Sequence, residues 1–141
     1  MNNISPIDGR YKENVSELEG YFSEQALMRY RILVEVAYLL SLVELKSFQK
    51  KRSLSKKTLS SLRSLYIEFS DKDFKQIKKI ESKTNHDVNA VVVFISEKLE
   101  KISRKDLIPL VHFGLTSEDI NNTAYSLMTK GATKNIRGPA I

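Results

Sequence analysis

The segment at residues 24–45 constrains the fold more than any other, because it contains no glycine, proline or asparagine. It is rich in Leu, Ile, Val and Tyr, and these apolar residues lie nearly all round a helical projection. Its β-branched residues would also suit a strand, but the segment is longer than an ordinary strand. Ser23 is a good N-cap immediately before it. The segment therefore predicts a long, buried helix.

Further helices are predicted by apolar residues that recur at spacings of three and four. Pairs such as Ser70 with Asp73 and Thr116 with Asp119 have the spacing of helix-capping boxes. The periodic runs cover residues 59–69 after Ser55, 74–80 after Ser70, 88–102, and 120–128 after Thr116. The expected fold class is all-α, with about five or six helices.

The two ends of the chain are expected to differ from this helical domain, which we place at residues 1–130. Residues 1–15 predict an extended N-terminal arm with a turn, because Pro6 fixes its own φ and Asp8-Gly9 is a turn signal. Residues 46–54 predict a basic linker. After Lys130 the apolar pattern stops, and residues 131–141 carry two glycines and a proline. We expect a frayed tail there, either the truncated start of a central helical bundle or a disordered end.

Composition excludes several classes of function. The sequence has no cysteine, so it has no disulfide, thiolate nucleophile or cysteine-ligated metal. Its two histidines lack the spacing of a zinc centre, and we expect no metal site. Glu35 and Glu44 interrupt the longest apolar stretch, which is too short to span a bilayer. No secretory signal pattern opens the chain, so we expect a cytoplasmic protein.

The net charge of +6 would favour an anionic partner. The lysines, however, are spread over several segments, and basic and aromatic residues do not alternate as a stacking platform for nucleic acid requires. We therefore expect a solvated basic surface and no nucleic-acid partner.

Three polar segments are candidates for a ligand site, and SPIDGRY at residues 5–11 is the first. In isolation it is a turn on the surface that carries an arginine and a tyrosine. The guanidinium of Arg10 would suit a phosphate, and Tyr11 can stack or donate a hydrogen bond, so the pair would suit a nucleotide.

The second candidate is TNHDV at residues 84–88, which precedes an apolar helix. Asn85, His86 and Asp87 could simply cap that helix. Alternatively, His86 could bind an anion or transfer a proton, because a histidine pKa lies near neutral pH.

The third candidate is HFGLTSEDINN at residues 112–122. Thr116 and Ser117 stand at a predicted helix start, where free N–H groups favour a carboxylate or phosphate. The simpler interpretation is a capping box. His112 stays unassigned.

Together with FSEQALMRYRILVEVAYL at residues 22–39, the three segments resemble the N-terminal region of bacterial adenylosuccinate lyases, of the fumarase and aspartase superfamily. The resemblance covers roughly residues 4–130. It implies the N-terminal helical domain of that lyase fold, a substrate site and no cofactor. By position, the substrate-binding residues would be Arg10, Tyr11, Asn85, His86, Asp87, Thr116 and Ser117.

The resemblance also implies a reaction, the β-elimination of fumarate from adenylosuccinate and from succinyl-aminoimidazole-carboxamide ribotide. In that family the general acid is a histidine and the base a serine in a Ser-Ser-x-Met-Pro-x-Lys-x-Asn loop. Both are expected beyond residue 141, so none of the residues here is expected to be catalytic. The full-length enzyme is expected to be a homotetramer, and this chain an inactive N-terminal fragment.

Two alternatives follow from the same residues. The chain could be a stand-alone helical module that binds AMP without turnover, or a helical interaction protein that associates through apolar faces.

Overall fold

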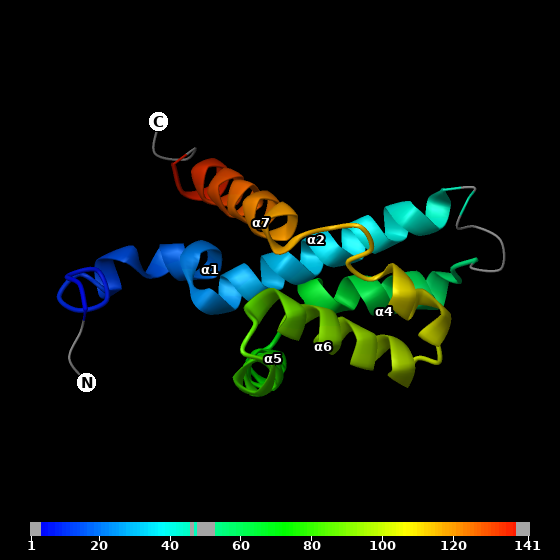
Figure 1. Cartoon of the computed structure of the whole chain (residues 1–141). Helices are drawn as coiled ribbons and strands as arrows, with labels where there is room; N and C mark the ends of the chain where they lie inside the picture. Colours follow the sequence, from blue (N-terminus) through cyan, green and yellow to red (C-terminus); the bar gives the residue numbers. More distant parts are fainter. Residues whose placement is uncertain (1–3, 46, 48–52, 138–141) are drawn as a thin grey trace.

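The structure is a computed structural model that describes residues 4–45, 47 and 53–137, and among these residues it contains helices and turns but no strand (Figure 1). The all-α class is confirmed. Most of the predicted linker lies outside the described residues. The elements are, in order, the 3-10 helix η1 (Glu13–Leu18), α1 (Glu19–Phe22), α2 (Glu24–Glu44), α4 (Lys56–Ile67), α5 (Asp71–Thr84), α6 (Asp87–Lys101), the 3-10 helix η2 (Lys105–Leu110), α7 (Ser117–Ala132) and the π-helical turn η3 (Thr133–Arg137).

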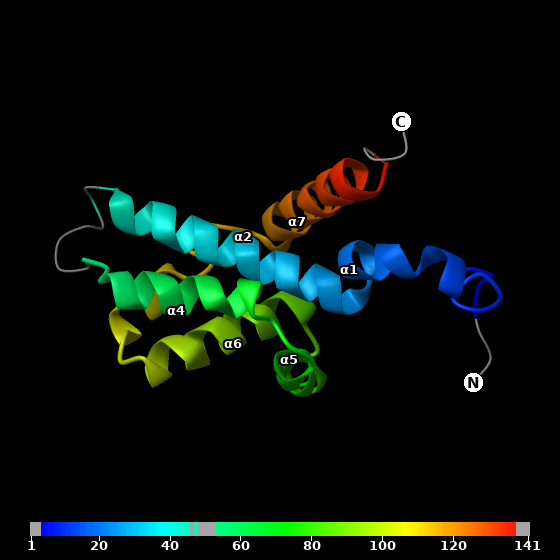
Figure 2. The same ribbon diagram turned by 180° about the vertical axis from the view of Figure 1, so that it is seen from behind.

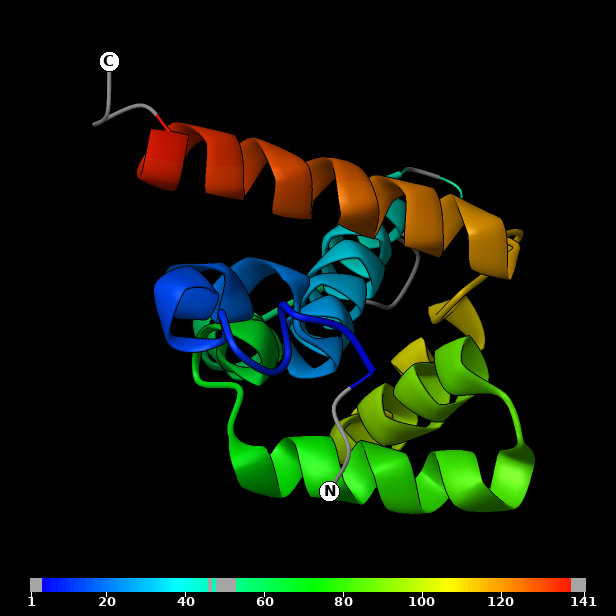
Figure 3. The ribbon, with the colours of Figure 1, turned by 90° about the vertical axis from the view of Figure 1, so that its left-hand side faces the viewer.

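Helix α2 is the centre of the molecule, as its length and apolar character predict. The Ser23 hydroxyl caps it by accepting a hydrogen bond from the Ala26 N–H at 3.1 Å. Helix α2 contacts α1, α4, α5, α6, α7 and η2, and Ile32 and Val36 are fully buried along it. Figure 3 shows α7 and α5 on opposite sides of α2. Elements far apart in the sequence are therefore held against one central helix.

Helices α5 and α6 form a pair joined by a tight turn. The predicted capping box of α5 is present, with the Ser70 hydroxyl donating to the Asp73 carboxylate at 2.7 Å. Lys98 of α6 donates to the same carboxylate at 2.8 Å and ties the two helices together. Asn85 ends α5 in the left-handed conformation, with φ of 52°, a state that asparagine tolerates better than most residues.

The N-terminal arm projects from the helical body, but its backbone is wound rather than extended (Figures 1 and 2). The Tyr11 N–H donates to the Pro6 carbonyl at 2.9 Å, and Asp8 accepts from the Ser5 N–H at 2.7 Å. Residues 6–12 are turns, and η1 follows. The sequence predicted a turn only at Asp8-Gly9, but local hydrogen bonds wind the whole segment.

The frayed end expected after Lys130 is corrected over residues 131–137, which are helical. Tertiary packing explains the difference, because a Cβ on Gly131 would stand 3.0 Å from a ring carbon of Tyr21 and from the Tyr30 hydroxyl. A glycine therefore lets α7 pack closely on α1 and α2. Asn135 of η3 also donates to the Tyr21 hydroxyl at 2.9 Å. Residues 138–141 lie outside the described part, and the division at residue 130 stays a prediction.

No helix in the described part of the chain combines the length and the apolar character needed to cross a membrane.

Candidate functional site

The TNHDV turn places His86 at the N-cap of α6. Its Nδ1 accepts a hydrogen bond from the Asn89 N–H at 3.2 Å, so Nδ1 carries no proton in this arrangement and Nε2 carries the proton of the neutral ring. The side chain is half exposed. The capping interpretation is therefore correct for Nδ1, while Nε2 remains available to a ligand.

Asp87, the next residue, is engaged by the protein itself. Its Oδ2 accepts from a guanidinium nitrogen of Arg31 at 2.6 Å, and its Oδ1 accepts from the Val88 N–H at 2.8 Å. Burial alone would raise the pKa of Asp87, but the Val88 N–H and the Arg31 charge outweigh it and hold this pKa below its usual value. Asp87 is therefore an ionised partner of Arg31.

The start of α7 has the capping pair expected from the sequence. The N–H and hydroxyl of Thr116 donate to the Asp119 carboxylate at 2.7 and 2.9 Å. The Thr116 N–H lowers the pKa of Asp119. Ser117 is the first residue of α7 and half-buried. The first N–H groups of α7 and the Ser117 hydroxyl are donors suited to an anion, while Glu118 and Asp119 add negative charge to the same turn.

Arg31, which the sequence analysis did not single out, links these two segments. It lies on α2, is 4% exposed, and donates through Nε to the Asn121 side-chain oxygen at 2.9 Å in addition to its bond to Asp87. One guanidinium therefore holds both the first residue of α6 and the first turns of α7. An arginine among the apolar residues of a helix expected to be buried was the available signal, because such a residue is rarely buried without a partner.

Glu35, one turn further along α2, holds the loop that leads into α7. Its carboxylate is within 2.6 Å of His112 Nδ1 and accepts the His112 N–H at 3.1 Å. Burial raises the pKa of Glu35, although the contacts with His112 oppose this shift. His112, which the sequence left unassigned, is thus the partner of a buried carboxylate.

Arg10 and Tyr11 stand apart from these segments. The Arg10 guanidinium lies 5.5 Å from the centre of the Tyr11 ring, and the Tyr11 backbone bonds within the arm. Both side chains are exposed on the arm that Figure 1 shows projecting from the body. The described residues therefore bring TNHDV and the start of α7 together through Arg31 and leave the arginine-tyrosine pair separate.

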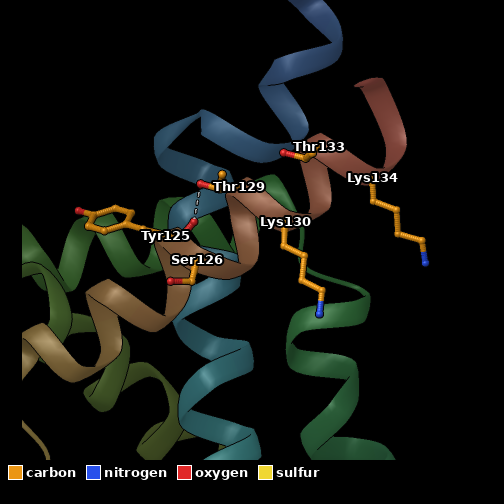
Figure 4. A pocket seen from close by; sticks show the side chains of 6 residues that line it. All are labelled: Tyr125, Ser126, Thr129, Lys130, Thr133 and Lys134. Atoms are coloured by element: carbon orange, nitrogen blue, oxygen red, sulfur yellow. Dashed lines mark hydrogen bonds between the residues drawn. The ribbon is translucent and has the colours of Figure 1, made fainter. Parts of the chain in front are cut away.

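One hollow of the surface includes Leu115, Asp119 and Ile120 in its lining and so lies beside the start of α7. Another runs along the outer side of α7 and η3, where Lys130 and Lys134 extend in the same general direction (Figure 4). It is lined by Tyr125, Ser126, Thr129, Lys130, Thr133 and Lys134. Within the described residues, no group of three or more His, Asp or Glu side chains could hold a metal ion.

Comparison with known proteins identifies relatives for nearly the whole chain. It is 40% identical over 141 residues to an adenylosuccinate lyase of Dictyostelium discoideum, covering 98% of this chain and 30% of that protein. It is 43% identical over 134 residues to an adenylosuccinate lyase of Buchnera aphidicola subsp. Baizongia pistaciae, and 39% identical over 134 residues to one of Escherichia coli K12. Each match covers 94% of this chain and 29% of the relative.

These matches confirm the resemblance to adenylosuccinate lyases, of which the chain spans about 30% of the length. A family model described as Lyase matches residues 9–139, which include Arg10 and Tyr11 of the first polar segment, the whole of the other two segments and every described helix. The chain therefore belongs to the Lyase family.

Proposed function

We propose that this chain provides part of the substrate site of an adenylosuccinate lyase in the cytoplasm. The substrates would be adenylosuccinate, which yields AMP and fumarate, and succinyl-aminoimidazole-carboxamide ribotide. The observation that carries the proposal is about 40% identity, over nearly the whole chain, to proteins with that name. No cofactor is part of it.

The α7 start suits the succinyl carboxylates of these substrates. Ser117 offers a hydroxyl, and the first N–H groups of α7 carry the positive end of the helix dipole. Thr116 already donates its hydroxyl to Asp119, so its role is to fix the helix start at which a carboxylate would bind.

The TNHDV turn would line the same site from the α6 side. His86 offers Nε2–H, Asn85 offers a side-chain amide beside it, and Asp87 fixes the turn through its bond to Arg31. Arg10 and Tyr11 would contact the nucleotide phosphate and sugar. Because they lie on the projecting arm, they would reach a site assembled with other subunits of a homotetramer.

Elimination requires a base that removes the proton beside a carboxylate, an acid that protonates the leaving nitrogen, and donors that stabilise the aci-carboxylate between these steps. The proposed residues here supply donors. The Ser-Ser-x-Met-Pro-x-Lys-x-Asn loop expected to carry the base does not occur in these 141 residues. The proposal therefore assigns binding to this chain and both proton transfers to residues outside it.

A titration of the isotope-labelled chain with adenylosuccinate and with AMP, followed by NMR, tests the proposal. Adenylosuccinate should bind more tightly, because its two extra carboxylates reach the start of α7. Ser117→Ala should remove most of that difference and leave AMP binding unchanged. Ser126→Ala, an exposed serine further along α7, is the matched control.

In the full-length homotetramer, where the arm would reach the assembled site, Arg10→Ala should weaken both ligands about tenfold, as expected for the loss of a charged contact. Lys12→Ala, which removes a neighbouring charge on the arm, should not. Equal affinity for AMP and adenylosuccinate in the unmodified chain would contradict the lyase site and favour the stand-alone AMP-binding module.

A further inference from the structure

Helix α2 carries two buried charged side chains, and charged residues are rarely fully buried in proteins. Within the described residues, Arg31 and Glu35 are the buried polar or charged side chains, at 4% and 1% exposure, and they stand one helical turn apart. Removing a charge from water costs several kcal/mol, and apolar residues of similar size are often equally stabilising or better. Stability alone therefore does not explain two buried charges on one helix.

Both side chains reach the polar segments rather than each other. Arg31 donates to Asp87 at the start of α6 at 2.6 Å and to Asn121 in α7 at 2.9 Å. Glu35 holds His112, four residues before the α7 cap, at 2.6 and 3.1 Å. Two adjacent turns of α2 thus hold three points of the candidate site.

The geometry of these contacts fixes direction as well as distance. A guanidinium is a planar fork, so its bonds to Asp87 and Asn121 set the angle between the two helices that carry them. The Glu35 carboxylate binds both the ring and the backbone N–H of His112, whose φ of 61° is in the left-handed region that non-glycine residues rarely adopt. Tyr38 adds a bond from its hydroxyl to the Phe113 carbonyl at 2.9 Å.

We propose that Arg31 and Glu35 are positioning residues that hold the TNHDV turn and the start of α7 in the relative placement that forms one ligand site. The role of the site rests on the proposed function, but the placement of the two segments does not. Arg31 acts through Asp87 and Asn121, and Glu35 acts through His112.

The first test needs no ligand. Residual dipolar couplings of backbone amides report the orientation of α7 relative to α6 in the 141-residue chain. Arg31→Lys keeps the charge and one bond to Asp87 but lacks the fork that reaches Asn121, so α7 should change orientation. Glu35→Gln should alter the chemical shifts of both His112 ring nitrogens and of the 112–116 amides.

Ile95→Val is the control, because it removes a methyl group from the buried face of α6 without touching either segment. It should leave the orientation of α7 unchanged. Arg31→Met provides a second variant of similar length without charge and should also reorient α7. An unchanged orientation in both Arg31 variants, or unchanged His112 shifts in Glu35→Gln, would overturn the proposal.

The second test measures adenylosuccinate binding in the same variants. Arg31→Lys and Glu35→Gln should each weaken binding at least tenfold, whereas Ile95→Val should keep the affinity within a factor of two. Wild-type affinity in a variant whose α7 has reoriented would overturn the positioning role. If the unmodified chain does not bind adenylosuccinate, the proposed function fails, and the orientation measurements still decide the placement by Arg31 and Glu35.

Discussion

At the scale of single residues, Asp87 has two roles, and they can be tested separately. It is a proposed substrate-site residue, and it neutralises the buried Arg31 guanidinium. Asp87→Asn keeps the shape and removes the charge, so Arg31 is left without a counter-charge. We expect a loss of about 2 kcal/mol in unfolding free energy, less than the ~3–5 for a fully buried pair because Asp87 is half exposed.

Urea denaturation followed by circular dichroism measures this loss. Glu68→Gln, which neutralises an exposed carboxylate at the end of α4, should change the midpoint little. Equal midpoints for Asp87→Asn and the unmodified chain would show that the ion pair contributes nothing to folding.

The acid stability of the chain should depend on Asp73 and Asp87. Burial opposes ionisation at both, but hydrogen bonds and cationic partners keep both pKa values below the usual value. Their stabilisation is present above the unfolded pKa of about 3.9 and is lost as the pH falls through the lower folded pKa. The raised pKa of Glu35 acts in the opposite direction, and its contribution is lost as the pH rises.

Unfolding free energies across a pH series test this dependence. Asp73→Asn should flatten the fall in stability on the acid side, because one of the carboxylates with a lowered pKa no longer titrates. An unchanged slope would show that Asp73 does not contribute to the pH dependence of stability.

Local patterns predicted the capping residues but not the partners of the buried charges. Ser23, Ser55, Ser70 and Thr116 were each expected at the start of a helix, since a cap depends on neighbours a few residues away. The bond between Arg31 and Asn121 joins residues far apart in the chain, and that between Glu35 and His112 does too. Periodicity reports which face is apolar and not which distant groups meet.

At the scale of elements, the cap of α2 should matter because so much packs on that helix. Ser23→Ala removes the acceptor for the Ala26 N–H and should cost about 1 kcal/mol. Ser126→Ala, on the exposed side of α7, should be neutral or slightly stabilising because alanine has the higher helix propensity. Chemical denaturation of both variants measures the difference, and equal midpoints would contradict the capping role.

The close approach of α7 to the first two helices depends on Gly131. Gly131→Val would place side-chain carbons against Tyr21 and Tyr30, and we expect a loss of about 2 kcal/mol by overpacking. Nothing lies within 4 Å of a Cβ at Gly20, so Gly20→Val should be near neutral. Thermal unfolding compares the two, and equal effects would mean that the α7 contact is loose.

The same contact explains why the end of the described chain differed from expectation. Gly131 is a helix breaker by propensity alone, and the apolar pattern stops beside it. In the structure its missing side chain is what allows the tyrosines to pack against α7, and the Asn135–Tyr21 hydrogen bond continues the contact. Tertiary packing outweighed local propensity here.

At the scale of the whole molecule, the purified 141-residue chain should release no measurable fumarate from adenylosuccinate. Its proposed residues bind and orient, and binding without the proton-transfer groups lowers little of the barrier. A fumarate assay, with E. coli adenylosuccinate lyase as the positive control, measures this directly. Turnover by the purified chain would require an acid and a base among these residues and would overturn the division of roles.

Because α2 is central, the free energy needed to open the structure locally should be highest at α2 and lowest at the N-terminal arm. Amides in the middle of α2, around Arg31 and Glu35, lie where packing comes from every side and should exchange with solvent only through global unfolding. No described residue of the arm or of η1 is buried, and both should exchange by local fraying. A ligand that contacted both Arg10 and Ser117 would therefore join a rapidly exchanging part of the protein to a slowly exchanging one. Most of the conformational entropy that the protein loses on binding would then come from ordering the arm.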